Sequence, residues 1–433
     1  MAIEPVNPLV IDPSKIQGDG FGIRLNNFGD VEYYGRVVVG TPLKEYRVVF
    51  DTGSTNFWIM SSKCRVETKT GKACKDKSLY NKHSSSTYTK RSGKFRQLYE
   101  IGFAYGDFAQ DVVAIGTLKS HSLLTPNVTF GLANVIDTAS QDDVIDGVMG
   151  LGFPKPGEPE SLINRAVAEG KLEKPLYTVW MKKVGGEVDR LGGEILFGDV
   201  DSEKCEASVG YTNLTSTNYW QFDVNDVEIN IGGETKKIAQ KIEAISDTGT
   251  SAIVMPRDMY RTLVSALGIK SNAPGLPYVK CNTKFSLNFA INGRNYSLSA
   301  QDLMVKYSDG CVLQFDVSAI EGDESWVLGD PFIRTYCQIY DLGRKRVGFA
   351  KAKVATKKKL KCGKKCVKSG RGQRWKKTHQ RDPDHFNGNP EMMQDDIKKD
   401  ENGSKFEENL EEYEDDSVEQ TEMDANTNRL ESL

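Results

Sequence analysis

The sequence lacks several features that would point to other classes of protein. No apolar run approaches the roughly 20 residues of a membrane-spanning helix, so we expect no membrane span. There are only four histidines, and none lies at ligand spacing from the eight cysteines, so we expect no metal site and no cofactor. The start, MAIEPVNPLVIDPSK, has neither a basic n-region nor an apolar h-region, so we expect no signal peptide in this chain.

Charge is unevenly distributed, although the 433 residues carry a net charge of only −3. Residues 351–381 contain 14 Lys and Arg and no acid, whereas residues 382–433 contain 18 Asp and Glu against four Lys and Arg. Both segments are poor in apolar residues, which predicts a disordered tail. The basic half alone would suit nucleic acid. Its acidic neighbour favours a solvated extension instead, so we expect no nucleic-acid partner.

Most of the remaining chain has the pattern of short β-strands. Runs rich in β-branched and aromatic residues are separated by Gly, Asn and Asp, as in VEYYGRVVVG, YRVVFDTG and WQFDVNDVEIN. Few segments have helical spacing, notably SLINRAVAEGKL and PRDMYRTLVSALG. Many short strands with few helices predict an all-β protein of packed sheets.

A motif in two parts occurs twice in the chain. FDTGSTNFWIM is followed by DGVMGLGF, and SDTGTSAIVM is followed by SWVLGDPFI. The second part of each copy has an apolar pair before a glycine, Gly150 or Gly329. Because both parts recur in the same order, we predict two related lobes that each supply one aspartate, Asp51 and Asp247, to a shared site.

Two facing carboxylates have a specific chemistry. When they lie within hydrogen-bonding distance they share one proton, and the pair can polarise a water molecule for attack on an amide carbonyl. The threonine after each aspartate can tie the two turns together, and the hydroxyl three positions after each aspartate can donate to its carboxylate. The residues expected to support Asp51 and Asp247 are Thr52, Gly53, Ser54, Thr248, Gly249 and Thr250.

These motifs resemble those of the pepsin-type (pepsin and cathepsin D-like) aspartic proteases over roughly residues 21–350. The matching stretches are NNFGDVEYYGRVVVGTP, VVFDTGSTNFWI, DGVMGLGF, GGEILFGDVD, AISDTGTSAIV, ESWVLGDPFIRTYCQIYD and KRVGFA. The resemblance implies a bilobal β-fold with a central cleft for an extended protein or peptide substrate, and apolar residues around the cleaved bond. We expect a leader of unassigned status over 1–20, lobes over 21–200 and 201–350, and a tail over 351–433.

The cysteines and glycosylation motifs indicate an oxidising, secretory route. The resemblance implies disulfides between Cys64 and Cys74 and between Cys281 and Cys311. Cys205 and Cys337 match no family bridge but flank segments expected in the central sheet, so a bond between them is a hypothesis. The pairing of the last two cysteines, Cys362 and Cys366, stays open. The glycosylation candidates are Asn127, Asn213 and Asn295, with a fourth sequon at Asn402 in the tail. We expect a monomer that is secreted or resides in an acidic, lysosome-like compartment.

The flap is where this chain departs from the family pattern. The family carries a hairpin over the cleft with a Tyr-Gly pair near its tip, and Trp58 matches the tryptophan that supports the flap tyrosine. Tyr105 has the following glycine but leaves a short hairpin, whereas Tyr99 keeps the hairpin length and lacks the glycine. We favour Tyr105. The altered flap is the one feature that supports an alternative function, a peptide-binding homologue without turnover.

Overall fold

The structure is a computed structural model that describes residues 20–68, 71–100, 102–155, 157–185, 188–269, 277–307, 310–319 and 322–353. The predicted leader, most of the predicted charged tail, Cys362, Cys366 and Asn402 lie outside these residues. Within the described residues, none of the helices has the length and apolarity needed to cross a membrane.

The predicted all-β class is confirmed, because strands dominate the described residues and form three sheets. The largest has 13 strands in the order β11-β23-β22-β9-β10-β1-β2-β3-β8-β4-β7-β6-β5. Its strands are β1 (Phe21–Phe28), β2 (Glu32–Val39), β3 (Lys44–Asp51), β4 (Phe57–Val66), β5 (Thr89–Leu98), β6 (Phe103–Gly116), β7 (His121–Ile136), β8 (Gly147–Gly150), β9 (Leu176–Met181), β10 (Val188–Phe197), β11 (Gly210–Asn213), β22 (Tyr336–Asp341) and β23 (Arg346–Lys351).

The other two sheets come from the second half of the chain. One has seven strands in the order β17-β16-β12-β13-β21-β14-β20, and the other has three in the order β15-β19-β18. Their bounds are β12 (Gln221–Ile231), β13 (Glu234–Ser246), β14 (Ile253–Met255), β15 (Tyr278–Val279), β16 (Ser286–Ile291), β17 (Arg294–Ser299), β18 (Met304–Lys306), β19 (Cys311–Leu313), β20 (Phe315–Val317) and β21 (Trp326–Leu328).

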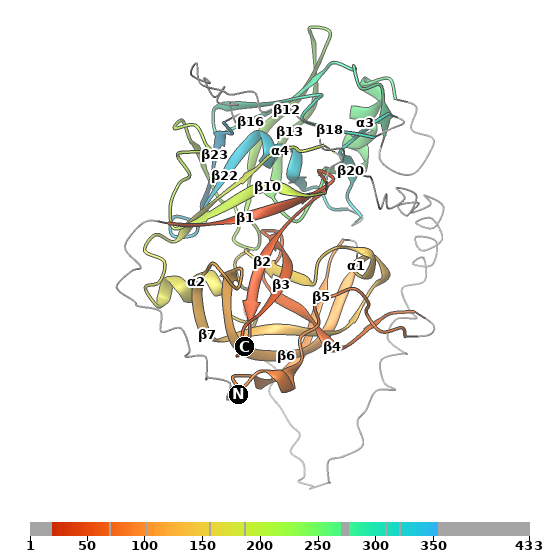
Figure 1. Ribbon diagram of the computed structural model, residues 1–433. Coiled ribbons are helices and arrows are strands. Elements are labelled where there is room, and N and C mark those ends of the chain that lie inside the picture. The colour runs from red at the N-terminus through yellow and green to blue at the C-terminus, as the bar shows by residue number, and fades with distance from the viewer. Residues whose placement is uncertain are drawn as a thin grey trace, which may run out of the picture. The chain divides into compact units, whose positions relative to one another are not determined.

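The fold is bilobal, as the resemblance implied. Figure 1 shows β2 to β8 in the lower lobe and β12 to β20 in the upper lobe, with β1 and β10 between them. Strands from the first and last parts of the described residues meet in this middle region, because β1 pairs with β10, β10 with β9, and β9 with β22. The lobe boundaries at 21–200 and 201–350 stay a prediction.

Both segments with helical spacing form helices. The helices of the described residues are α1 (Thr138–Asp142), α2 (Leu162–Ala168), α3 (Arg257–Ala266) and α4 (Asp330–Thr335), with one 3₁₀ turn at Lys82–Ser84. SLINRAVAEGKL contains α2, whose start is capped because the Ser161 side chain accepts a hydrogen bond from the Asn164 N–H. PRDMYRTLVSALG contains α3, which begins directly after Pro256.

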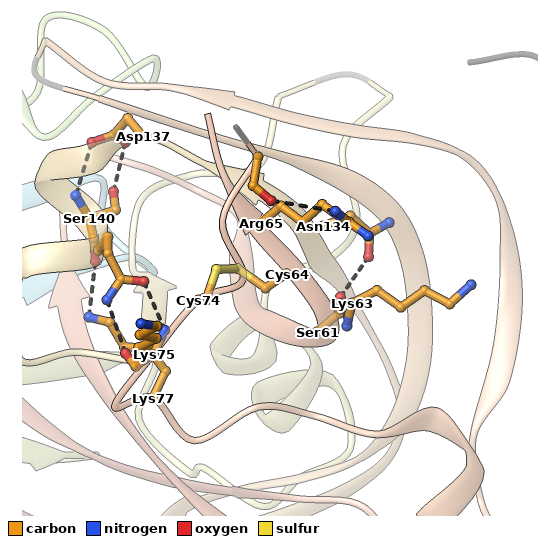
Figure 2. The surroundings of a disulfide bond; sticks show 12 residues. Ser61, Lys63, Cys64, Arg65, Cys74, Lys75, Lys77, Asn134, Asp137 and Ser140 are labelled. Atoms are coloured by element: carbon orange, nitrogen blue, oxygen red, sulfur yellow. Dashed lines mark hydrogen bonds between the residues drawn. A yellow bond between two sulfur atoms is a disulfide. The ribbon is translucent and has the colours of Figure 1, made fainter. Parts of the chain in front are cut away.

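Three disulfides are present. Cys64–Cys74 closes a loop after β4 (Figure 2), and Cys281–Cys311 links β19 to the segment before β16. The third joins Cys205 to Cys337, the pair that was a hypothesis from the sequence, with a Cα–Cα distance of 6.0 Å. It spans 132 residues and ties the segment before β11 to β22. The described residues contain no free cysteine.

Candidate active site

Each candidate catalytic aspartate lies at the end of a strand that the second part of its motif supports. Asp51 is the last residue of β3 and lies opposite Gly150 of β8 in a parallel pair. Asp247 follows β13, which pairs in parallel with β21, and its N–H donates to the Leu328 carbonyl at 3.3 Å. The two parts of each repeated motif are therefore neighbouring strands.

The glycines of the repeat are needed for close packing against the aspartate turns. A Cβ at Gly150 would lie 2.4 Å from the Thr55 carbonyl carbon, and a Cβ at Gly329 would lie 2.1 Å from the Thr250 oxygen. No real Cβ tolerates such distances from backbone atoms, so only glycine fits either position. This explains why the sequence repeats an apolar pair and a glycine so far from each aspartate.

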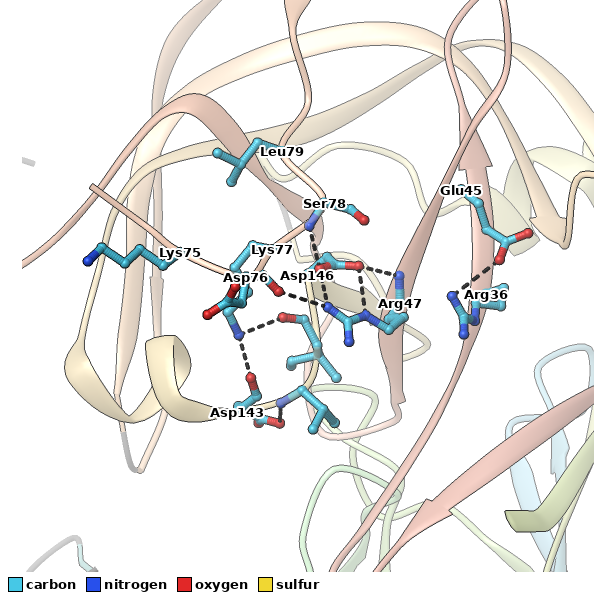
Figure 3. A network of polar contacts seen from close by, with 12 residues as sticks. Arg36, Glu45, Arg47, Lys75, Asp76, Lys77, Ser78, Leu79, Asp143 and Asp146 are labelled. Carbon is cyan, nitrogen blue, oxygen red and sulfur yellow. Dashed lines mark hydrogen bonds and ion pairs between the residues drawn. The ribbon is translucent and has the colours of Figure 1, made fainter. Parts of the chain in front are cut away.

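Asp146 fixes the start of β8 beside β3. Its carboxylate is fully buried and accepts hydrogen bonds from the Arg47 N–H at 2.8 Å and the Ser78 N–H at 2.7 Å. The Arg47 guanidinium also donates to it, at 2.9 Å (Figure 3). The first residue of DGVMGLGF thus holds the strand that supports Asp51.

The two aspartate turns are joined by a symmetrical exchange of hydrogen bonds. The Thr52 N–H donates to Thr248 Oγ1 and the Thr248 N–H donates to Thr52 Oγ1, both at 3.0 Å. The hydroxyls donate in turn, from Thr52 to the Ser246 carbonyl at 2.9 Å and from Thr248 to the Phe50 carbonyl at 2.5 Å. Both threonines are buried, so these bonds hold the turns in one relative position.

This pairing brings each carboxylate against the glycine of the opposite turn. A Cβ at Gly53 would lie 2.6 Å from Asp247 Cγ, and a Cβ at Gly249 would lie 2.5 Å from Asp51 Oδ1. Because any larger residue would collide with the opposing carboxylate, the glycine in each Asp-Thr-Gly triplet allows the two acids to approach each other.

Each carboxylate also accepts two hydrogen bonds from its own turn. The Gly53 and Gly249 N–H groups donate to Oδ1 of Asp51 and Asp247, both at 2.8 Å. The hydroxyls three residues after the aspartates donate to Oδ2, both at 2.5 Å. The hydroxyls belong to Ser54 and Thr250. These bonds fix the orientation of both carboxylates within their turns.

Burial raises the pKa of Asp51 well above its usual range, and the charge of Asp247 raises it further. The hydrogen bonds from Ser54 and Gly53 oppose this shift. Two carboxylates this close cannot both ionise at low cost, so one proton is retained by the pair. This proton belongs to the pair as a unit.

The structure places Tyr99, and not the favoured Tyr105, against Trp58. The Trp58 indole N–H donates to the Tyr99 hydroxyl at 2.6 Å. Burial raises the pKa of Tyr99, and the nearby charge of Asp51 raises it further, so the phenol stays protonated beside the acids. Tyr105 lies on β6 opposite Arg96, with its ring stacked on Phe103 at 4.6 Å. The hairpin of β5 and β6 therefore keeps its length, and Glu100 stands after Tyr99 in place of the family's glycine.

Replacing Trp58 by Phe should lower kcat/KM by about tenfold, since it removes the single hydrogen bond from the indole to Tyr99. The measurement is cleavage of a short quenched peptide by the purified protein. Trp180→Phe is the matched control, because Trp180 is equally a buried indole but belongs to β9. Equal losses from both substitutions would contradict a specific role for Trp58.

Sequence reasoning missed two side chains that hold the turn after Asp51. Thr55 Oγ1 donates to Glu158 Oε2 at 2.6 Å, and Asn56 Nδ2 donates to Gln97 Oε1 at 3.1 Å. Gln97 lies on β5 two residues before Tyr99, so the second bond joins the catalytic turn to the flap strand. Glu158 and Gln97 have no motif of their own in the sequence, and only the tertiary fold brings them to this turn.

The remaining candidate residues lie at the surface. Asn127, Asn213 and Asn295 are all exposed, which leaves their side chains accessible. Among the described residues, no group of three or more His, Cys, Asp or Glu is placed to hold a metal ion.

Residues 32–352 match the sequence model of the eukaryotic aspartyl protease family. The chain belongs to this family. Aspartic protease 6 of Caenorhabditis elegans is 35% identical over 335 residues, which cover 75% of this chain and 83% of that protein. Aspartic protease 2 of Necator americanus is 32% identical over 362 residues, covering 75% and 84%. Gastricsin of Mus musculus is 32% identical over 330 residues, covering 74% and 81%. As an aspartyl protease, the chain is an aspartic endopeptidase that acts on polypeptide substrates.

Proposed function

We propose that this aspartyl protease hydrolyses peptide bonds with a water molecule held between Asp51 and Asp247. The observation that supports it best is the close approach of each carboxylate to the glycine of the opposite turn. The ionised carboxylate of the pair takes a proton from the water as the water oxygen attacks the peptide carbonyl, and the carboxyl that holds the shared proton donates it to the carbonyl oxygen. The tetrahedral intermediate collapses when the carboxyl that took up the water proton passes it to the leaving nitrogen, while a hydroxyl of the intermediate returns a proton to the other carboxylate. The C–N bond breaks, an amine and a carboxylic acid are released, and the pair again holds one proton.

The substrate we propose is an extended polypeptide bound between the lobes, with apolar residues around the cleaved bond. Tyr99, supported by Trp58, is the flap tyrosine in this proposal. We further propose a monomer that is secreted or works in an acidic, lysosome-like compartment. The alternative, a peptide-binding homologue without turnover, has less support, because both acids and all four supporting hydroxyls are in place.

The pH dependence of cleavage tests this mechanism. The raised pKa of Asp51 means that the pair keeps its proton well above the usual range of an aspartate. We expect kcat/KM to be highest in acid and to fall as the pH rises through the raised pKa of Asp51, because the proton donor is then lost. The measurement is the rate of quenched-peptide cleavage from about pH 3 to about pH 8, with and without a statin-type transition-state mimic.

Two results would contradict the proposal. One is cleavage that increases towards neutral pH, and the other is cleavage that the statin-type mimic does not inhibit. Properly folded protein that binds the peptide and never cuts it would favour the binding homologue instead.

A further inference from the structure

The outer face of the flap-bearing sheet has a row of side chains that the active site does not use. Register places Arg65 of β4 opposite Val135 of β7, Val135 opposite Tyr105 of β6, and Tyr105 opposite Arg96 of β5. Directly paired residues project from the same face of a sheet. Two arginines therefore lie on this face with an aromatic ring between them.

The opposite face of the same strands packs into the lobe. Phe95 and Ala104 are fully buried in the cluster that contains Trp58. Because side chains alternate along a strand, Lys94, Arg96 and Leu98 point the other way, and all three are exposed. Leu98 is 68% exposed.

Aromatic rings add an apolar component to this outer face. Phe103 and Tyr105 stack at 4.6 Å with an interplanar angle of 18° and belong to neither buried cluster of the lobe. Phe103 lies opposite the exposed Leu98 across β5 and β6. The apolar groups are thus continuous with the basic ones.

The charge of this region is strongly positive. Residues 61–98 contain 11 Lys and Arg against two acids, Glu67 and Asp76. Of those that the structure describes, eight are exposed: Lys63, Arg65, Lys72, Lys75, Lys90, Arg91, Lys94 and Arg96. Figure 2 shows Lys63 and Arg65 on either side of Cys64.

Acids offset only part of this charge. Asp107 on β6 forms an exposed ion pair with Lys94 at 3.2 Å. Burial raises the pKa of Tyr105, and the nearby charge of Glu67 raises it further, so this acid also lies close to the face. Arg65 is partly engaged as well, because its guanidinium donates to the Gly71 carbonyl at 3.4 Å. The structure gives Lys90, Arg91 and Arg96 no ion pair among the described residues.

The strand that carries these cations is also an open edge. β5 is the last strand of the 13-stranded sheet and pairs only with β6 among the described residues. An open edge can accept another extended polypeptide through backbone hydrogen bonds, whereas lysines and arginines on it repel a second basic strand. The edge is therefore selective for a strand that carries negative charge.

We propose that the outer face of β5 and β6 is a docking site for an extended, acidic segment of a partner polypeptide with interspersed apolar side chains. The segment adds to the edge of β5, its carboxylates pair with Lys94 and Arg96, and its apolar side chains contact Leu98, Phe103 and Tyr105. A nucleic acid or a sulfated glycan would satisfy the cations alone. The open strand edge and the apolar groups favour a polypeptide.

The test is binding of a fluorescein-labelled peptide with the repeat Glu-Ser-Val-Ser to the full chain, measured by anisotropy. In an extended strand this repeat puts the Glu and Val side chains on the same face, as the proposed site requires. An Asp51→Asn background prevents cleavage of the probe. We expect the double substitution Lys94→Glu/Arg96→Glu to weaken binding at least about tenfold, and raising the salt from about 0.05 to about 0.5 M to weaken it as well. Lys236→Glu on β13, an exposed lysine of the other lobe, should change the affinity less than about twofold.

Two further arms keep the proposal falsifiable. If near-UV circular dichroism shows that Lys94→Glu/Arg96→Glu does not fold, Lys94→Gln/Arg96→Gln replaces it. This neutral double variant should also bind the peptide more weakly than the parent. A probe N-methylated at alternate residues cannot donate backbone hydrogen bonds to β5 and should bind at least about fivefold more weakly. The proposal is overturned if the basic residues have no effect on binding. It is equally overturned if the N-methylated probe binds as well as its parent and heparin displaces both, since the site would then recognise only negative charge.

Discussion

Substituting Asn for either Asp51 or Asp247 should lower kcat by about 10³- to 10⁴-fold, the largest catalytic effect expected in this chain. Asn keeps the size of the side chain and its carbonyl oxygen can still accept one of the two bonds from its own turn, but it cannot hold or release the shared proton. Without that proton, water activation and carbonyl polarisation cannot occur together. The measurement is the rate of quenched-peptide cleavage in acid, with enzyme concentration fixed by the protein's absorbance.

The control for this result is Asp226→Asn, which removes an exposed carboxylate paired with Lys237 at 2.6 Å. It should leave kcat within about twofold of the parent, because a surface ion pair contributes little. Near-UV circular dichroism should show that all three variants are folded. Full activity in either dyad variant would refute the assignment of Asp51 and Asp247, whereas loss in the Asp226 variant as well would point to a preparation that has lost its fold.

The paired aspartates were predictable because their geometry is local and repeated. Each Asp-Thr-Gly turn carries its own hydrogen-bond donors within three residues, so the sequence contains most of each half-site. The distant glycines, Gly150 and Gly329, were also visible, because the repeat preserves their order. The structure adds the physical reason, which is that both lie against the backbone of an aspartate turn.

The flap was less predictable because its register depends on tertiary pairing. The Tyr-Gly pair favoured Tyr105, although its hairpin was short; in the structure β5 continues to Leu98 after a register shift between Lys90 and Lys94. That irregularity sets which residues reach the tip, and nothing in the motif reports it. Tyr105 then falls on the outer face, and Tyr99 reaches Trp58.

A second large effect is expected from Glu32, the first residue of β2. Burial raises the pKa of Glu32 to about 10, and its hydrogen bond with Asp143 and the charge of Asp143 contribute. Its Oε1 atom is buried without a hydrogen-bond partner. The folded protein thus holds this carboxyl protonated at neutral pH, while the unfolded chain releases the proton above its ordinary value of 4.5.

The sign of the effect on stability follows from proton linkage. Below pH 4.5 both states bind the proton and Glu32 adds no pH-dependent cost, but above it the unfolded state gains by ionising and the folded state does not. Between pH 4.5 and neutrality this lowers the free energy of unfolding by about 3 kcal/mol, at about 1.4 kcal/mol per pH unit. Glu32→Gln cannot ionise, so the variant should be more stable than the parent by that order near neutral pH and equally stable in acid.

Chemical denaturation at a series of pH values measures this difference. Glu234→Gln, at an exposed carboxylate on the hairpin between β12 and β13, is the matched control and should follow the parent curve at every pH. If the free energies of unfolding of Glu32→Gln and the parent differ by the same amount at every pH, the folded protein ionises Glu32 normally. A smaller gain that still grows with pH would mean that the folded protein ionises Glu32 in part at neutral pH.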